Sequence, residues 1–524
     1  MSEADGVKIL SSLGSLFMLQ QELTKKSVDL ARLRSLFGLQ TSEKTAKVLT
    51  GNGSDTGSAG QSNGADTAPA KPKKKAKGHG RKGADDYEGA DRVKIPHASL
   101  ASGDPCPECP TNKGGKVYTM AKPRTLVRVV GRAPLHATVY EQERLRCNLC
   151  GTIFTAEPPL GIGDKKYDAT AASMIGLLKY GSGMPFNRLG GLQGNLGIPL
   201  PAATQWDIVQ ESAGDLTPIH EELIRQAAQA RLMHNDDTSM RVLALREQID
   251  KAQKSGTAKS DRTGIFSTNI VSVLDDGHRI ALYFTGRQHA GENIQDVLTK
   301  RAAELDKPMQ MCDGSGHNLP AAFATLVGNC LAHARRKFVE VVNSFPDECR
   351  RVLETLRDVY AHDDTARKRG MSDGDRLSYH QEHSRPLMDD LRRWMDAQLE
   401  QKLVEPNSAL GKAITYMTKR WDRLTLFLRE PGAPLDNNIS ERALKKAILH
   451  RRNSLFYKTE NGAKVGDLFM ALIHTAELAD ANPLDYLKAL LENTDDAHRE
   501  PARWMPWNYP TVSGDRGAVQ SASG

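Results

Sequence analysis

A regular spacing of apolar residues near the start of the chain predicts a long amphipathic helix. The spacing is a heptad, and one of its positions is held by Ile9, Leu16, Leu23, Leu30 and Phe37. Such a repeat is typical of a short coiled coil with a second copy of the chain. Packing onto the same chain is the alternative, because Lys26 interrupts the second apolar stripe. Residues 41–90 hold few large apolar side chains and are rich in Gly, Ser, Ala and Lys, which predicts a flexible linker.

The pattern between residues 168 and 230 is that of short helices separated by turns. We predict helices at residues 171–180, 186–196 and 204–212, the last two joined by a turn that contains Gly197. Two helices across such a turn are compatible with a helix-turn-helix that places its second helix in a DNA major groove. Gln205 and Asp207 would then begin the helix that contacts the bases. A small helical bundle gives the same pattern.

From residue 231 onward, strand-like and helix-like patterns alternate. Strands are predicted at residues 231–235, 240–245, 265–274, 279–285, 308–312 and 329–332, and helices at residues 291–304 and 319–327. Asp275-Asp-Gly277, between two of the strands, predicts a hairpin turn. Residues 338–430 are charged and almost wholly helical in pattern. The sequence therefore predicts a mixed α/β core that is interrupted by a helical insertion.

Composition and charge narrow the classes of function. The chain has 524 residues, 39% hydrophobic content and a net charge of +7, enough for several domains. It has no apolar run of about 18 residues and no secretion signal at its start, so we expect a cytoplasmic protein with no membrane partner. Basic residues crowd residues 71–82, where Lys73, Lys74 and Lys75 could contact phosphates. A solvated linker explains that run equally well.

Four of the seven cysteines form two closely spaced pairs. They are Cys106 with Cys109, and Cys147 with Cys150. Disulfides are disfavoured in the cytoplasm, whereas two such pairs can bring four thiolates to one tetrahedral Zn²⁺ ion. Strand-like runs at residues 117–118, 125–130 and 137–140 would supply the hairpins of a zinc ribbon. Coincidence and a redox-active dithiol are the alternatives.

Three acidic segments carry the candidate chemistry. Asp236-Asp237 and Asp313 follow apolar runs that predict strands, and Glu441 lies in a helix-like stretch after Asp436. Each acidic residue alone is more typical of a solvated surface charge or a helix cap. Together they match a two-metal phosphoryl-transfer site, because Mg²⁺ takes oxygen ligands and keeps positions open for water and phosphate.

Several motifs together resemble the insertion sequence 66 family of bacterial transposases. The matching stretches run in the family's order at residues 33–44, at the two cysteine pairs, and at residues 234–243, 330–338, 435–444 and 505–508. The segments that begin at His333 and Asp436 are the most specific. The resemblance implies a DDE transposase with a ribonuclease H-like core that uses two Mg²⁺ (or Mn²⁺) ions. Its catalytic and metal-binding residues would be Asp236, Asp313 and Glu441.

The chain departs from the family pattern at a few positions near these residues. Asp237 stands where the family has Glu, and residues 314–317 and Leu331 replace aromatic positions. Asp237 assists Asp236 or caps the strand. Glu441 is spaced to form an ordinary ion pair with Lys445, so that is the alternative to metal binding. Cys330 and His333 have metal-ligand spacing but lack a second pair, which favours a buried thiol and a site-adjacent histidine.

The resemblance also implies the roles of neighbouring residues. His333, Asp237 and Asn438 would lie next to the site. The residues expected to contact DNA phosphates are Arg335, Arg336, Lys337, Arg442, Lys445 and Lys446. DNA is then the main partner, as insertion-element ends with terminal inverted repeats and as target DNA. We further expect a homodimer or higher oligomer, accessory proteins encoded by the element, and a nucleoid-associated location in a bacterial cytoplasm.

The predicted organisation follows from these assignments. It comprises an N-terminal amphipathic helix (1–40), a basic linker (41–92), a zinc ribbon (93–160), a helical DNA-binding segment (161–230), the first part of the catalytic core (231–338), a helical insertion (339–430), the helices that complete the core (431–495) and a tail (496–524).

Two other functions stay open. One is an inactive, zinc-containing DNA-binding regulator derived from a transposase, and the other is a nuclease of the same fold without strand transfer.

Overall fold

The computed structural model describes residues 98–107, 115–120, 133–146, 153–159, 165–255 and 262–512. The chain divides into two compact units, one made of Met1–Asp55 with Leu135–Gly524 and the other of Thr56–Pro134. In the smaller unit, Pro105 and Lys116 form an isolated antiparallel bridge. The heptad helix, the linker and the lysines at 73–75 lie outside the described residues, as do Cys109, Cys147 and Cys150.

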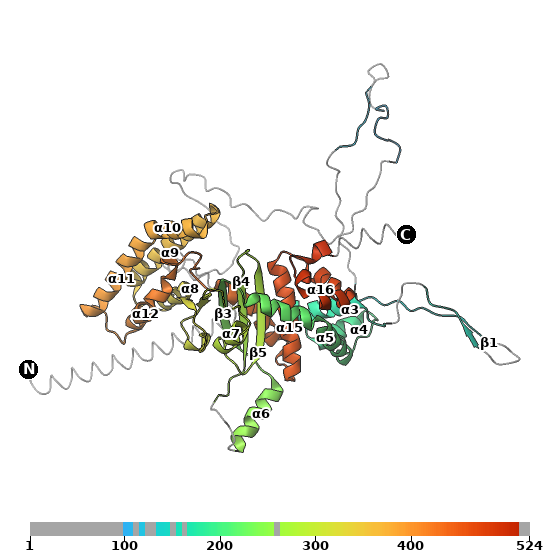
Figure 1. The fold of residues 1–524 in the computed structure, drawn as a ribbon, viewed down its shortest axis with the longest axis horizontal. Coiled ribbons are helices and arrows are strands. Elements are labelled where there is room, and N and C mark those ends of the chain that lie inside the picture. The colour runs from blue at the N-terminus through green and yellow to red at the C-terminus, as the bar shows by residue number, and fades with distance from the viewer. Residues whose placement is uncertain are drawn as a thin grey trace, which may run out of the picture. The chain divides into compact units, whose positions relative to one another are not determined.

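A five-stranded mixed sheet forms the centre of the larger unit (Figure 1). Its strands are β3 (Leu232–Ser239), β4 (Phe266–Val273), β5 (Arg279–Gly286), β6 (Met309–Cys312) and β7 (Leu326–Asn329). The order across the sheet is β5-β4-β3-β6-β7, with β3, β4 and β5 antiparallel and with β6 and β7 parallel to β3. This sheet confirms the predicted mixed α/β core.

Helices cover the sheet and create the main hydrophobic core. α14 (Asn438–Ser454) packs on β3 and β4, and α15 (Glu460–Leu478) packs along β5. α15 is buried over most of its length because α5 (Ala202–Ala227) and α16 (Pro483–Glu492) pack against its other sides. A helix that is apolar on all sides is expected in such a central position. α7 (Ala290–Leu298), α17 (Thr494–Arg499) and the 3₁₀ turn Pro501–Trp504 complete this part.

The helices predicted between residues 168 and 230 are present. They are α3 (Ala169–Gly176), the π-helical turn Leu177–Gly181, α4 (Phe186–Asn195) and α5 (Ala202–Ala227). The role foreseen for Gln205 is wrong, however. Its side chain is fully buried and donates hydrogen bonds to the carbonyl oxygens of Phe186 and Leu200, each at 2.9 Å. Gln205 therefore joins α4 to α5 instead of facing a DNA base, whereas Asp207 is exposed.

The charged region after residue 330 forms a helical layer, and its core also includes Leu232 of β3 and Met309 and Met311 of β6. It contains α8 (Leu331–Val339), α9 (Pro346–Lys368), α10 (Asp373–His383), α11 (Arg385–Glu400), α12 (Ala409–Thr418), α13 (Trp421–Leu424) and the 3₁₀ turn Leu426–Leu428. Buried residues such as Phe338, Leu353 and Phe427 belong to this second core. The helical pattern predicted for residues 338–430 is confirmed.

Three local predictions in the core are wrong. The strand predicted at residues 329–332 is one of them, because β7 ends at Asn329 and α8 begins at Leu331. Residues 240–245 do not form a strand, because only Val242 makes an isolated bridge, with Tyr457, before α6 (Leu243–Lys254) begins. Strong helix formers and the spacing of buried Leu245 and Ile249 favour this helix. Residues 319–327 do not form a helix. A 3₁₀ turn at Gly316–Asn318 is followed by bends and then by β7, whose pairing with β6 satisfies its backbone.

Secondary structure near the second cysteine pair is sparse in the described residues. β1 (Arg144–Arg146) and β2 (Ile153–Thr155) form a two-stranded antiparallel sheet on either side of that pair. Residues 137–140, predicted as a strand, have no regular structure. The zinc ribbon therefore stays a prediction. Across the described ranges, no helix combines the length and apolar character needed to cross a membrane.

Candidate active site

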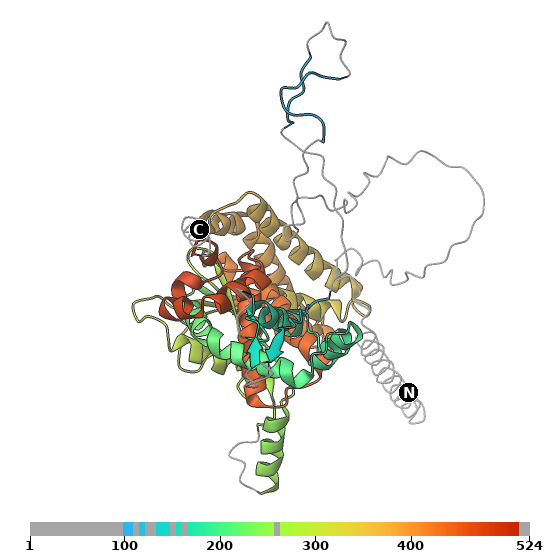
Figure 2. The ribbon, with the colours of Figure 1, turned by 90° about the vertical axis from the view of Figure 1, so that its right-hand side faces the viewer.

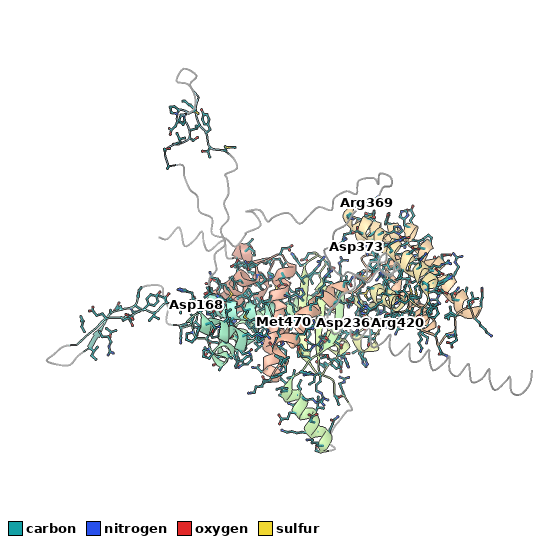
Figure 3. All side chains as sticks on the ribbon, turned by 180° about the vertical axis from the view of Figure 1, so that it is seen from behind. Asp168, Asp236, Arg369, Asp373, Arg420 and Met470 are labelled. Atoms are coloured by element: carbon teal, nitrogen blue, oxygen red, sulfur yellow. The ribbon has the colours of Figure 1, made fainter. Side chains whose placement is uncertain are left out.

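Three acidic residues, separated widely in the sequence, meet on one face of the sheet. Asp236 lies within β3, Asp313 follows the parallel neighbour β6, and Glu441 lies in the first turn of α14, which covers β3. Figure 3 shows Asp236 between the labelled Met470 and Arg420. Burial, and after it the charges of Asp313, Asp237 and Glu441, raise the pKa of Asp236 to about 7. Four carboxylates therefore repel one another at this point.

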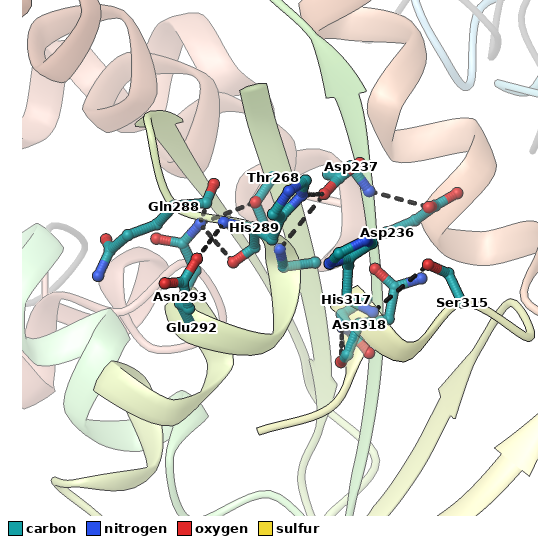
Figure 4. Close-up of polar contacts among 12 residues, drawn as sticks. Asp236, Asp237, Thr268, Gln288, His289, Glu292, Asn293, Ser315, His317 and Asn318 are labelled. Carbon is teal, nitrogen blue, oxygen red and sulfur yellow. Dashed lines mark hydrogen bonds and ion pairs between the residues drawn. The ribbon is translucent and has the colours of Figure 1, made fainter. Parts of the chain in front are cut away.

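The neighbouring Asp237 has a different environment. Its backbone amide donates to the Oδ1 of Asp236 at 2.9 Å, while its own carboxylate contacts His289 Nδ1 at 3.0 Å. The backbone amide of Ala290 donates to the same carboxylate oxygen at 3.4 Å (Figure 4). Asp237 therefore lies at the N-terminus of α7, where a negative charge is stabilised. The ring of His289 also stacks on His317, with centroids 4.5 Å apart.

Asp313 is held in place by the turn that follows β6. Its Oδ1 accepts a hydrogen bond from the backbone of Ser315 at 2.9 Å and another from the side chain of Asn318. The carbonyl of Asn318 in turn accepts from Asn235 Nδ2 at 2.9 Å and from Gln310 Nε2 at 2.7 Å. All three amide side chains are buried. This polar layer links the strand that carries Asp236 to the turn that carries Asp313. In the sequence, the only indication of the layer is that Asn235 and Gln310 lie within apolar strands.

The start of α14 is fixed to β3 by Asn437, a residue that the sequence analysis missed. Its Oδ1 lies 3.1 Å from His234 Nδ1, and its Nδ2 donates to the carbonyl of Asn235 at 3.1 Å. Its backbone amide donates to Cys330 Sγ at 3.3 Å. Burial lowers the pKa of His234 to about 4, so this ring is neutral. Asn437 therefore sets the position of Glu441, one helical turn later, relative to Asp236.

Asn438, which was predicted to lie beside the site, has only local bonds. Its backbone and side chain both donate to the carboxylate of Asp436, at 3.1 and 2.8 Å. The two adjacent asparagines therefore differ in function. Asn437 joins the helix to the sheet, while Asn438 organises the turn before the helix.

His333 and Cys330 lie beside Glu441. His333 Nε2 is 3.6 Å from Glu441 Oε1, and single donor atoms of the three residues lie within 4.8 Å of one another, so they could hold a metal ion. Burial raises the pKa of Cys330 to about 11, which disfavours the thiolate that a metal ligand requires. His333 and Glu441 are the better ligands of the three. Lys445 lies more than 4.0 Å from Glu441, so the ordinary helix ion pair is not formed between these two described residues.

The predicted phosphate-binding residues fall into separate groups. Arg442 and Lys445 are exposed on α14. Lys446 is 16% exposed and forms an ion pair with Glu477 of α15 at 2.8 Å, a position that does not favour a phosphate contact. Lys337 is exposed and lies 3.6 Å from Glu340, and the residues before it, at 335 and 336, are half-buried in α8. Of the four predicted zinc ligands, the structure describes Cys106, which is half-buried.

Comparisons with known proteins point to one family. The model of the transposase IS66 family matches residues 166–465. The chain is 27% identical over 417 residues to the uncharacterized protein y4hP of Sinorhizobium fredii, covering 74% of this chain and 70% of that relative. It is also 34% identical over 185 residues to the uncharacterized protein y4jD of the same organism, covering 34% of this chain and 35% of that relative.

Proposed function

The chain belongs to the IS66 family of transposases, and from this premise we propose that it binds the ends of an insertion element, cleaves DNA there and joins the 3′ end to target DNA. The observation that carries the proposal is the convergence of Asp236, Asp313 and Glu441. Two adjacent parallel strands and the helix that covers them bring these carboxylates together. A half-buried carboxylate whose pKa is raised by burial and by neighbouring carboxylates, as at Asp236, is typical of functional sites.

Divalent cations fit this set of donor atoms. The carboxylates offer the oxygen ligands that Mg²⁺ and Mn²⁺ prefer, and Glu441 Oε1 is buried without a hydrogen-bond partner. Asp236, Asp313 and Glu441 would together hold the ions as carboxylate ligands. When bound, the ions would supply an activated water or 3′-hydroxyl and stabilise the leaving oxygen.

The protein's own contribution is to hold these groups rigidly and to orient the DNA. Asn437 and the Asn235–Gln310–Asn318 layer fix the carboxylates before the substrate arrives. Such fixed geometry is worth several kcal/mol of the barrier in comparable reactions, roughly 7–11 in the best cases. We propose that Arg442 and Lys445, which are exposed on α14, contact DNA phosphates near Glu441. No covalent enzyme intermediate is needed, so no Ser or Tyr nucleophile is assigned.

The remaining parts of the chain are assigned more coarsely. We propose that Cys106, Cys109, Cys147 and Cys150 hold one structural Zn²⁺ ion, on the strength of their spacing. The lysines at 73–75 would bind DNA through the phosphate backbone. The heptad at residues 9–37 would pair two copies of the chain, as the joining of two element ends requires.

A cleavage assay tests the proposal. Purified protein is incubated with labelled element ends and Mg²⁺, and cleavage and strand transfer are measured separately. Asp236→Asn, Asp313→Asn and Glu441→Gln should each abolish both steps and leave DNA binding intact. Asp436→Asn is the matched control, because Asp436 is an acidic neighbour that bonds Asn438, and it should keep cleavage within a few-fold of the wild type.

The outcomes separate the competing functions. No cleavage by the wild type, with binding retained, would favour an inactive DNA-binding regulator. Cleavage without joining would favour a nuclease. Equal losses in Asp436→Asn and Glu441→Gln would contradict the assignment of the third carboxylate.

A further inference from the structure

The ends of β3 and α14 meet beyond the carboxylates. Arg451 Nη1 donates to Thr238 Oγ1 at 3.1 Å and to Ser239 Oγ at 2.8 Å, so the last turns of α14 lie against the last residues of β3. The chain after α14 then runs beside the chain after β3. The backbone amide of Tyr457 donates to the carbonyl of Arg241 at 2.9 Å. Figure 2 shows α6, which follows Arg241, projecting from the body here.

This junction carries positive charge that no acidic group balances. Arg241 and Arg452 are exposed, and Arg451 lies close enough for both to lower its pKa, after the larger effect of its own burial. None of the three arginines has a carboxylate within 4.0 Å among the residues that the structure describes. Lys445, Leu449 and Arg452 follow Glu441 at helical spacing, so this charge is continuous with the face of α14 that holds the carboxylate.

An exposed apolar tip projects from the same junction. Leu455 is 58% exposed and Phe456 is 42% exposed, directly after α14. Leu455 has φ of 69° and ψ of −42°, and the amide of Phe456 donates to the carbonyl of Ser454 at 2.9 Å. This is a γ-turn with positive φ, which is strained for a residue with a side chain. Core packing does not explain the strain, because both apolar side chains face outward.

A pocket of about 270 Å³ lies at the same junction, since Arg241, whose carbonyl accepts from the amide of Tyr457, is among its lining residues. Apolar Met240, Val242 and Ile265 also line it, together with Arg246, whose Nε lies 3.2 Å from Asp250 Oδ1. Guanidinium planes and apolar side chains both stack on nucleobases. The pocket is thus lined by groups suited to a single displaced base.

We propose that Arg241, Arg451, Arg452, Leu455 and Phe456 form a DNA-binding wedge surface. The arginines hold phosphates of the element end while the apolar tip enters the base stack, and the displaced base enters the pocket. Duplex DNA is the occupant that matches both features, since it offers phosphates and stacked apolar faces side by side. This inference rests on the proposed function, because it assigns DNA as the substrate.

The structure also predicts where the wedge acts. Leu455, the first residue of the apolar tip, is 14 residues beyond Glu441, which at about 1.5 Å per residue is roughly 21 Å. DNA that follows the helix rises about 3.4 Å per base pair. The unstacked base should therefore lie roughly six base pairs from the cleaved phosphate.

Base unstacking can be measured without catalysis. Duplexes carrying the element ends are labelled with 2-aminopurine at successive positions from the cleavage site and bound by full-length protein in Ca²⁺ buffer. Fluorescence should rise at one position roughly six base pairs from the cleavage site. Phe456→Ala and Leu455→Gly should remove the rise at saturating protein. Leu403→Ala, a 64% exposed leucine in the helical insertion, is the control that should retain it.

The arginines have a test of their own. The double variant Arg241→Gln/Arg452→Gln should bind DNA with a weaker dependence on salt. The slope of the logarithm of the binding constant against the logarithm of the salt concentration should fall in magnitude by about two, because each phosphate contact contributes about one. A slope equal to that of the wild type would overturn their role.

The outcomes distinguish this inference from the proposed function. Cleavage by the wild type with no fluorescence rise at any position, or with an equal rise in Phe456→Ala, would overturn the wedge and leave the transposase intact. A rise without cleavage would support the wedge and remove the catalytic proposal. A Phe456→Ala variant that loses self-association and keeps the rise would assign the tip to a second copy of the chain instead.

Discussion

Asn437 offers the sharpest test of how the site is assembled. Its side chain is fully buried and bonds two partners on β3, His234 Nδ1 and the carbonyl of Asn235. Replacement by Ala removes both bonds and leaves the neutral His234 ring without a partner in a buried position. The backbone amide, which donates to Cys330, is unaffected.

The expected loss of stability follows from these bonds. Each lost hydrogen bond costs about 1 kcal/mol net, and each buried polar group left unpaired adds roughly 1–3 kcal/mol. Asn437→Ala, which removes two such bonds and leaves the His234 ring unpaired, should therefore lower the free energy of unfolding by about 3–5 kcal/mol. Cleavage should fall by roughly 100-fold, because a shift of about 1 Å in the start of α14 displaces Glu441.

Asn438→Ala is the matched control, since it removes the same side chain one position later. Asn438 is half-buried and bonds only Asp436, so its loss should cost about 1 kcal/mol or less. Urea unfolding at constant slope, with cleavage on the same samples, measures both quantities. Equal shifts in the two variants would refute the claim that Asn437 joins the helix to the sheet.

Three further predictions address other groups. Burial raises the pKa of Asp467 to about 7. Between about pH 4 and 7 the folded state therefore keeps a proton on Asp467 that the unfolded chain has lost, so the free energy of unfolding falls as the pH rises. Asp467→Asn should remove up to about 4 kcal/mol of this fall, as measured by urea unfolding across that pH range. Gly291→Ala should lower the free energy of unfolding, measured by urea unfolding, by about 1–3 kcal/mol, because a Cβ would lie 2.3 Å from the carbonyl of Leu319. Titration with Co²⁺ should give no sulfur-to-cobalt absorption band from Cys330, because burial keeps its thiol protonated. An absorption band that is present in the wild type and lost in Cys330→Ser would show instead that this thiol is a metal ligand.

Strands could be predicted from the sequence where a single local pattern of residues determines them. Apolar runs on both sides of Asp275-Asp-Gly277 predicted β4 and β5 within one residue at either end. β3 was predicted too short, because Asp236 and the polar residues after it break the apolar run. Pairing with β4 carries the strand on to Ser239, opposite Phe266. Tertiary hydrogen bonding overrides propensity there.

The hydrogen bonds that assemble the site could not be predicted from the sequence, because they too depend on tertiary structure. Nothing in the sequence distinguishes Asn437 from Asn438, because only the direction of the first turn of α14 decides which one meets β3. Gln205 is a similar case, since a polar side chain at the start of a helix suits DNA contact and buried capping equally well. The convergence of the acidic segments was predicted, because strands and motif order imply it, but the polar layer beneath them was not.

The order of the carboxylates along the chain has a consequence for synthesis. Asp313 and Glu441 are 128 residues apart, with the helical insertion between them. At roughly 5–20 residues per second, a ribosome needs roughly 6–26 s to make that stretch. During this interval the nascent chain holds two of its three acidic residues and lacks the helix that delivers the third. On the proposed mechanism, each copy would therefore be unable to cleave nearby DNA until Glu441 has been made, and a transcript broken before codon 441 would yield no active enzyme.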